Sequence, residues 1–372
     1  MPEVGAPFAL GGAPLRRFWR NARGFWRGET AGIAWGLIGS LAVCVVLQLL
    51  VQYRLNLWNR DFFNALEQRN GLEIWRQAYL LMEFAAMSVS LAIFAVWGRM
   101  TFQRRWREWV SRDLIQGWLA GEHYRRIDQM DGEHQNAEYR ISEDARLATD
   151  APIDLVVGLL AAVLAAGTFV IVLWNVGGAL DVGMLGWRLR IPGYLVVAAV
   201  IYSAITTGGM MWVARNMVHV IERKNQAESE LKYAVAHLRE TAAGRAPRSD
   251  GIGELAAIVW SALGEVIRQW RRLCGQHMRT TLVSSGNTLL APLIGLILCV
   301  PKYVHGTMQL GEVTQAAAAF FAVQGSFNWL VDNYPRLAEC LSSANRVGIL
   351  LIAFDKLEGS DGRAAPDGPQ EG

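Results

Sequence analysis

Residues 31–53 form an uninterrupted apolar run, AGIAWGLIGSLAVCVVLQLLVQY, that contains no Lys, Arg, Asp or Glu. A helix rises about 1.5 Å per residue, so this run is long enough to cross a hydrocarbon core of roughly 30 Å. The 30 preceding residues carry five arginines, and the run exceeds the roughly 7–15 apolar residues of a signal peptide. We therefore interpret residues 31–53 as a retained first membrane span.

Five further apolar blocks of similar length follow the first one. They lie at residues 78–98, 151–174, 191–213, 282–304 and 309–331. Of the 372 residues, 52% are hydrophobic and 19% are charged, whereas soluble domains are about 25% charged. Because the apolar excess is concentrated in span-length blocks, the sequence predicts an all-α integral membrane protein with six transmembrane helices. It disfavours a soluble enzyme and a disordered regulator.

The distribution of basic residues predicts the orientation of the spans. The segments that would lie on the same side as the N-terminus contain 29 of the 36 Lys and Arg residues, and the alternate segments contain the other 7. Cytoplasmic connections of membrane proteins are enriched in Lys and Arg. We therefore expect both termini to lie in the cytoplasm.

The two long cytoplasmic connections, after the second and fourth spans, have helical patterns of their own. Residues 99–130 contain no proline, and residues 215–240 and 254–279 are rich in helix formers. Helix breakers fall in the middle of each connection, at Gly132 and at residues 244–253, GRAPRSDGIG. Each connection is therefore predicted to be a long helix, a turn and a long helix back. By analogy, this is the architecture of an ABC-exporter-type transmembrane domain.

Five stretches of the sequence carry a resemblance to a known family. They are LNLWNRDFFNALEQRN (55–70), WREWVSRDLIQGWL (106–119), NAEYRISEDARLATD (136–150), NQAESELKYAVAHLRE (225–240) and FNWLVDNYPRLAECLSSANRV (327–347). With these stretches in this order, the chain resembles the SbmA/BacA-like peptide uptake transporters and the related bacterial permease–ATPase fusions. The resemblance implies a homodimer of six-helix halves in the bacterial inner membrane. It also implies import of peptides or other bulky hydrophilic compounds.

The sequence departs from the fused relatives in its nucleotide chemistry. It contains no GxxxxGK[ST] motif, whose glycine-rich turn and lysine hold phosphates. We expect a cytoplasmic N-terminal segment (residues 1–30), a six-helix transmembrane domain (31–358) and a low-complexity, disordered tail (359–372). The chain is therefore expected to need no cofactor and to be no enzyme by itself.

Three functional hypotheses follow. The leading hypothesis is a proton-coupled importer whose partners are a peptide substrate, the lipid bilayer and a second copy of the chain. The alternative is the permease subunit of an ABC transporter with a separate ATPase subunit, docked on the cytoplasmic tips near Gly132 and residues 245–251. A non-transporting membrane scaffold is the third.

Acidic residues in or beside the spans are the candidates for proton coupling. A charge is costly in hydrocarbon, and burial raises the pKa of a carboxylate toward the working pH. Glu83 lies about six residues into the second span, where a hydrogen bond to a neighbouring helix or snorkelling is the alternative. Asp154 and Asp150 flank Pro152 at the start of the third span, where helix capping is the alternative.

The sixth span contributes two further candidates for proton coupling. Glu312 lies at its start, where an acid complements the helix dipole. Asp332 lies at its end, where an acid opposes the dipole, and Arg336 four residues later is its expected partner.

The stretch at residues 55–70, which is predicted to face away from the cytoplasm, supplies candidates for gating, and so does the fifth span. Trp58, Arg60, Asp61 and Glu67 combine charges with aromatic rings. This pattern suits an outer gate or a substrate contact, and equally an interfacial aromatic belt with a structural ion pair. Pro292 interrupts the fifth span and is a candidate hinge, because proline bends a helix.

Other patterns carry less information about function. The six histidines are scattered and no HExxH motif occurs, so we expect no metal site and no catalytic residue. The four cysteines have no CxxC spacing and are interpreted as apolar fillers. The basic patches suit anionic lipid better than nucleic acid. Polar residues of the sixth span either face a wet cavity or join helices: Thr314, Gln315, Gln324, Ser326 and Asn328.

Overall fold

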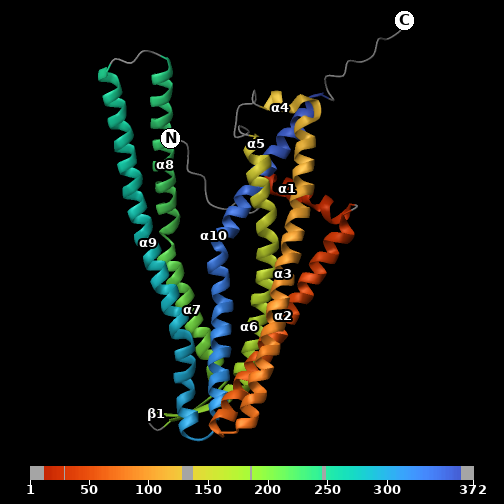
Figure 1. Ribbon diagram of the computed structural model, residues 1–372, viewed down its shortest axis with the longest axis vertical. Coiled ribbons are helices and arrows are strands. Elements are labelled where there is room, and N and C mark those ends of the chain that lie inside the picture. The colour runs from red at the N-terminus through yellow and green to blue at the C-terminus, as the bar shows by residue number, and fades with distance from the viewer. Residues whose placement is uncertain (1–11, 29, 128–136, 185–186, 245–248, 362–372) are drawn as a thin grey trace. The chain divides into compact units, whose positions relative to one another are not determined.

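The computed structural model describes residues 12–28, 30–127, 137–184, 187–244 and 249–361 (Figure 1). Within these residues, six helical segments are long and apolar enough to cross a membrane. They are Ala31–Glu67, Gly71–Arg126, Ala137–Gly177, Tyr194–Arg239, Gly253–Val304 and Leu310–Glu358. Each covers all or nearly all of one of the six predicted spans, so the all-α membrane fold is confirmed.

The chain divides into two compact units. Residues 1–168 and 332–372 belong to the first unit, and residues 169–331 form the second. The boundaries fall inside two long helices, α6 (Ala145–Gly177) and α10 (Leu310–Asp361). Each of these helices therefore contributes residues to both units.

In the first unit, α2 (Ala31–Glu67) and α3 (Gly71–Leu119) form an antiparallel helical hairpin (Figure 1). The tight turn between them places Arg69 in a left-handed conformation, with φ of 55°. The Asn70 side chain then caps α3 by accepting a hydrogen bond from the Glu73 amide at 3.3 Å. A short polar turn therefore reverses the chain between the first two spans.

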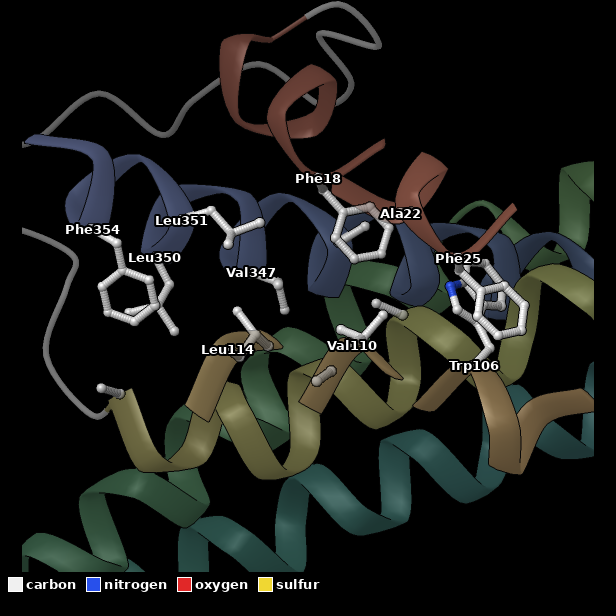
Figure 2. Close-up of a cluster of buried hydrophobic side chains, with 14 of the residues drawn as sticks. Phe18, Ala22, Phe25, Trp106, Val110, Leu114, Val347, Leu350, Leu351 and Phe354 are labelled. Carbon is white, nitrogen blue, oxygen red and sulfur yellow. The ribbon is translucent and has the colours of Figure 1, made fainter. Parts of the chain in front are cut away.

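A helix that the sequence patterns did not predict, α1 (Ala13–Arg27), precedes the first span. Its buried residues Phe18, Ala22 and Phe25 recur at helical spacing. Figure 2 shows them in a cluster with residues of α3 and α10: Trp106, Val110, Leu114, Val347, Leu350, Leu351 and Phe354. The N-terminal segment is thus partly a packed helix, because its three apolar residues complete a core that is formed by distant parts of the chain.

The second predicted span continues beyond the membrane but ends earlier than expected. Residues 99–130 were predicted to form one helix, whereas α3 ends at Leu119 and the short α4 (His123–Arg126) follows. Gly121 and Glu122 break the helix, since both adopt positive φ. The turn predicted at Gly132 lies outside the described residues.

The approach to the third span is helical well before the apolar block. The short α5 (Ala137–Tyr139) leads through a π-helical turn (Arg140–Asp144) into α6. Pro152 therefore lies inside a continuous helix. The capping interpretation of Asp150 and Asp154 is wrong for this reason, because the helix begins upstream of both.

The second unit contains a β-hairpin that the sequence patterns did not predict. Strands β1 (Ala179–Met184) and β2 (Trp187–Pro192) pair antiparallel, with Ala179 opposite Pro192. The helix of the fourth span, α7 (Tyr194–Ala214), starts three residues later than the predicted boundary at residue 191. Gly193 precedes it with φ of 61° and lies against the Trp174 ring, a position that suits only glycine.

The long connection after the fourth span is the predicted pair of helices. In Figure 1, α8 (Met217–Gly244) and α9 (Ser249–Val304) run antiparallel and side by side. Of the turn predicted at residues 244–253, Gly244 and residues 249–253 are helical, and residues 245–248 lie outside the described residues. The helix α9 continues through Pro292 and Pro301.

Two contacts join α9 to its neighbours in the second unit. The Tyr194 hydroxyl donates to the Leu298 carbonyl at 3.1 Å. Gly295 lets α9 approach α10 closely, because a Cβ there would lie 3.0 Å from the Ala317 Cα. At the other end of α10, residues 359–361 of the predicted disordered tail belong to the helix, and residues 362–372 lie outside the described part.

Candidate functional site

Asp154 of α6 is the centre of a charged network in the first unit. Its Oδ1 atom lies 3.3 Å from Arg99 Nε and accepts a hydrogen bond from Gln103 Nε2 at 3.0 Å. Its Oδ2 atom accepts a hydrogen bond from Arg336 of α10. The Asp154 side chain is only 11% exposed. A single carboxylate therefore connects three helices, each of which contains a predicted span.

Local sequence explains how the network is positioned. Arg99 and Gln103 are four residues apart on α3, so they lie on one face of that helix. Gln103 Nε2 also donates to the carbonyl oxygen of Asp150 at 2.7 Å, one turn before Asp154. The side-chain amide of Gln103 thus fixes the position of α3 along the axis of α6.

The structure corrects the partner that we expected for Arg336. It bonds Asp154 rather than Asp332, which is exposed and forms no ion pair within the described residues. The physical reason is solvation, because a pair four residues apart on an exposed helix face is worth only a few tenths of a kcal/mol. The shielded carboxylate on the neighbouring helix interacts with Arg336 more strongly.

A cavity of about 230 Å³ lies beside this network. Its lining includes Arg336 and two carboxylates, Asp150 and Glu339. Arg146 also lines it and forms an ion pair with Glu143 at 2.5 Å. The cavity is large enough to hold several waters. The Asp154–Arg336 pair is therefore shielded by protein on one side and adjoins a polar space on the other.

A second ion pair in the first unit was missed by the sequence patterns. Arg346 of α10 contacts both carboxylate oxygens of Asp144, through Nε at 2.9–3.0 Å and Nη2 at 2.6 Å. Asp144 is 1% exposed, and its hydrogen bond raises the pKa of Arg346. The available signal was that both residues lie in stretches that carry the family resemblance. Hydrophobic periodicity alone does not reveal such a pair.

The two glutamates among the proton-coupling candidates have different surroundings. Glu83 lies on an exposed face of α3 and makes no hydrogen bond or ion pair within the described residues. Glu312 accepts a hydrogen bond from the Gln309 amide at 2.9 Å, which closes the first turn of α10. Glu83 forms no contact with Asp154 within the described residues, and Glu312 belongs to the second unit.

The motif with Trp58, Arg60, Asp61 and Glu67 lies at the end of α2. Arg60 and Asp61 form a half-exposed ion pair with Nε and Oδ1 2.9 Å apart. The Trp58 ring stacks on Phe62 at 5.1 Å, and its Nε1 donates to the Gln77 carbonyl of α3 at 2.8 Å. Trp58 therefore holds the hairpin together, and Glu67 is the last residue of α2.

Polar residues of the second unit mainly join helices. The Tyr202 hydroxyl of α7 donates to Asn287 of α9 at 2.8 Å, and Thr207 donates to Asn328 of α10 at 3.4 Å. Gln324 is buried. The helix-joining interpretation of the sixth-span residues is therefore realised at Asn328. Within the described residues, no group of three or more His, Cys, Asp and Glu side chains could hold a metal ion.

The six long apolar helices indicate a multi-pass α-helical membrane protein. The family described as ABC transporter transmembrane region 2 matches residues 28–304. This match covers most of the chain, and the chain belongs to that family of transporter membrane domains.

Similar proteins come from bacteria and plants. The chain is 24% identical to the inner membrane ABC transporter ATP-binding protein YddA of Escherichia coli, over 82% of this chain and 56% of the relative. It is 22% identical to an uncharacterized ABC transporter ATP-binding protein of Haemophilus influenzae, over 86% and 54%. It is 18% identical to ABC transporter D family member 2, chloroplastic, of Arabidopsis thaliana, over 90% and 45%. The chain thus spans about half the length of these curated relatives.

Proposed function

We propose that two copies of this chain form a transporter that imports peptides or other bulky hydrophilic compounds across the bacterial inner membrane. We further propose that the proton gradient drives this import. Membership in a family of transporter membrane domains supports transport. The observation that carries the coupling proposal is the shielded carboxylate of Asp154, held between arginines of two other helices beside a polar cavity.

In this mechanism, Asp154 acts as a proton-sensitive clasp. The ionised carboxylate attracts Arg99 and Arg336 and so holds α3 and α10 against α6. If Asp154 is neutralised during the transport cycle, both ion pairs weaken. The helices then separate more easily, which a bulky solute requires for passage. Loss of the proton on the cytoplasmic side restores the closed state.

The other candidates keep supporting roles in this proposal. Glu83 faces away from the packed interior of its chain, so in a dimer it would offer a second proton site. Arg60 and Asp61 would form an outer closure that is independent of Asp154. Glu312 and Asp332 are weaker coupling candidates, because the first caps a helix and the second is exposed.

The first experiment is peptide uptake into sealed liposomes that contain the purified full chain and no nucleotide. With an acidic exterior, we expect a fluorescent Pro- and Arg-rich peptide to accumulate, and an uncoupler to abolish the accumulation. Asp154→Asn should lose gradient-driven accumulation while peptide exchange at equal pH continues. This split separates a coupling residue from a merely structural one.

Two matched variants sharpen the result. Asp150→Asn removes a carboxylate one turn away on the same helix and should retain most uptake. Glu83→Gln tests the second candidate carboxylate. Unchanged accumulation in Asp154→Asn, together with loss in Glu83→Gln, would transfer the coupling role to Glu83. No uptake at all by folded, dimeric protein would contradict the proton-driven mechanism.

The second candidate function is the permease subunit of an ABC transporter with a separate ATPase. The observation that favours it is that the relatives are named ATP-binding proteins and are matched over only about half of their length. In that case the cytoplasmic tip at the start of α9 is the docking surface. A cysteine at the exposed Glu254 should then cross-link to a co-purified ATPase, whereas one at Leu72, on the opposite side, should not.

A further inference from the structure

The unpredicted helix α1 presents arginines along one face. Arg16, Arg20, Arg23 and Arg27 are exposed and spaced four, three and four residues apart, which places them on a single helical stripe. The opposite face of α1 is buried against α3 and α10 (Figure 2). The apolar face of α1 is thus already occupied by protein, and the basic stripe remains accessible.

A cavity of about 820 Å³ opens beside part of this stripe. Four arginines line it against one acid, Asp355, so the lining has a formal excess of three positive charges. Arg17 holds both oxygens of Asp355, at 2.6 and 2.8 Å. Within the described residues, Arg20 and Arg23 form no ion pair. These two guanidinium groups are therefore available to an anion.

The remaining walls of the cavity are apolar. Leu15 and Trp19 of α1 and Leu341 and Ile352 of α10 contribute to them. Trp19 is 39% exposed, so part of its ring is accessible from the cavity. A ligand that fits this cavity therefore combines an anionic group with an apolar portion.

We propose that this cavity binds an anionic phospholipid, with the headgroup phosphate on Arg20 and Arg23 and an acyl chain along Leu341 and Ile352. Guanidinium groups bind phosphate oxygens in a bidentate geometry, which suits this pair. The helix α1 ends only four residues before the first span begins, so its basic stripe would lie close to the predicted membrane surface. A free phosphate would leave the apolar walls uncovered. This assignment does not depend on the substrate or energy source of transport.

Native mass spectrometry of the full chain with phosphatidylglycerol and with phosphatidylcholine of identical acyl chains tests the proposal. We expect preferential retention of phosphatidylglycerol, and a drop of about tenfold in its affinity in the double variant Arg20→Gln/Arg23→Gln. The matched control is Arg27→Gln, which removes the same charge from the same stripe outside the cavity. It should leave the affinity within about twofold of the wild type.

Three outcomes would overturn the proposal. Equal retention of the two lipids, or an equal loss of affinity in Arg27→Gln, would show that no specific headgroup site exists. Displacement of the lipid by inorganic phosphate at the same concentration would assign the site to free phosphate.

The variant Arg20→Lys/Arg23→Lys, which retains both charges, checks that any loss does not come from misfolding. Brominated phosphatidylglycerol should also quench wild-type fluorescence more than that of Trp19→Phe.

Discussion

Three aspartate–arginine pairs of the first unit differ mainly in burial. The carboxylate of Asp144 is 1% exposed, that of Asp154 is 11% exposed and that of Asp355 is 43% exposed. The free-energy loss on removing the arginine should fall in the same order, because an unpaired carboxylate is costly only where water cannot reach it. We therefore interpret the most buried pair as structural, and the intermediate pair is the one to which we assign the proposed switching role.

Removing Arg346 should destabilise the protein strongly. Arg346→Gln leaves Asp144 charged, buried and unpaired, which costs about 3–5 kcal/mol. The exposed pair of Arg112 and Glu108 provides a control, and Arg112→Gln should cost about 0.5 kcal/mol or less. Denaturant unfolding in detergent measures both values. Adding Asp144→Asn to Arg346→Gln should recover part of the loss, and no recovery would show that charge is not the cause.

The pair of Arg17 and Asp355 should make the docking of α1 depend on pH. A hydrogen bond from Arg17 lowers the pKa of Asp355, and its charge acts in the same direction. A lowered folded-state pKa means that the ionised carboxylate stabilises the fold above pH of about 4. This stabilisation is lost as the pH falls through the folded-state pKa.

The measurement is the difference in thermal unfolding between the wild type and Asp355→Asn from pH 7 to pH 3. The difference should amount to about 1 kcal/mol or less at neutral pH, because the pair is half-exposed. It should shrink toward zero in acid. Glu230→Gln, which removes an exposed acid of α8, is the control. A difference that stays constant with pH would exclude the ion pair as its source.

Among the elements, α10 packs against different helices at its two ends. Its last turns pack against α1, and its first part joins α7 and α9 in the second unit. Glycines mark both situations. Gly348 lies against the backbone of Pro14 in α1, whereas a Cβ at Gly325 would meet no neighbour within 4 Å. Glycine is therefore needed for close packing at Gly348, whereas no neighbouring atom requires it at Gly325.

Substituting these two glycines by alanine should have opposite effects. At Gly348 the added methyl group overlaps the Pro14 carbonyl, so Gly348→Ala should destabilise the protein by about 1–3 kcal/mol. At Gly325 the alanine only improves helix propensity, so Gly325→Ala should stabilise by up to about 1 kcal/mol. Thermal unfolding in detergent compares the two. A loss of similar size in both would indicate that helix flexibility, rather than contact with α1, is what matters.

At the scale of the whole molecule, the six helices match the predicted spans, and the proposed orientation rests on the distribution of charge. The side predicted to be cytoplasmic carries 29 of the 36 basic residues. It includes α1 and the α8–α9 pair, where both proposed docking sites lie. If the orientation were reversed, α1 would not face the cytoplasmic leaflet and α9 could not reach a cytoplasmic ATPase. Both proposals therefore depend on the predicted topology.

Cysteine labelling with a membrane-impermeant maleimide tests the orientation. Cys274 is exposed and is first replaced by serine, whereas the other three cysteines are buried. Leu72, which is 82% exposed after the α2–α3 turn, should become reactive as cysteine in intact spheroplasts. Glu230→Cys in α8 should react only after permeabilisation. The opposite pattern would contradict the charge-based orientation.

The six spans could be predicted because hydropathy is a local property. Each apolar block must leave water whatever its neighbours are, so its length and composition determine that it is a membrane helix. The helical connections were also predictable, because they are rich in helix formers. The helix α1 escaped prediction because only three of its fifteen residues are buried, and that burial depends on distant partners.

The candidate site illustrates the limit of sequence patterns. Asp154 and Arg336 were both noted, yet Arg336 was assigned to Asp332 because local spacing offers only neighbours on the same helix. Its actual partner is 182 residues away. The sequence by itself determined which segments enter the membrane, since transfer from water is a property of each segment. Only the tertiary structure decided which charges meet, because ion pairing depends on the register between packed helices.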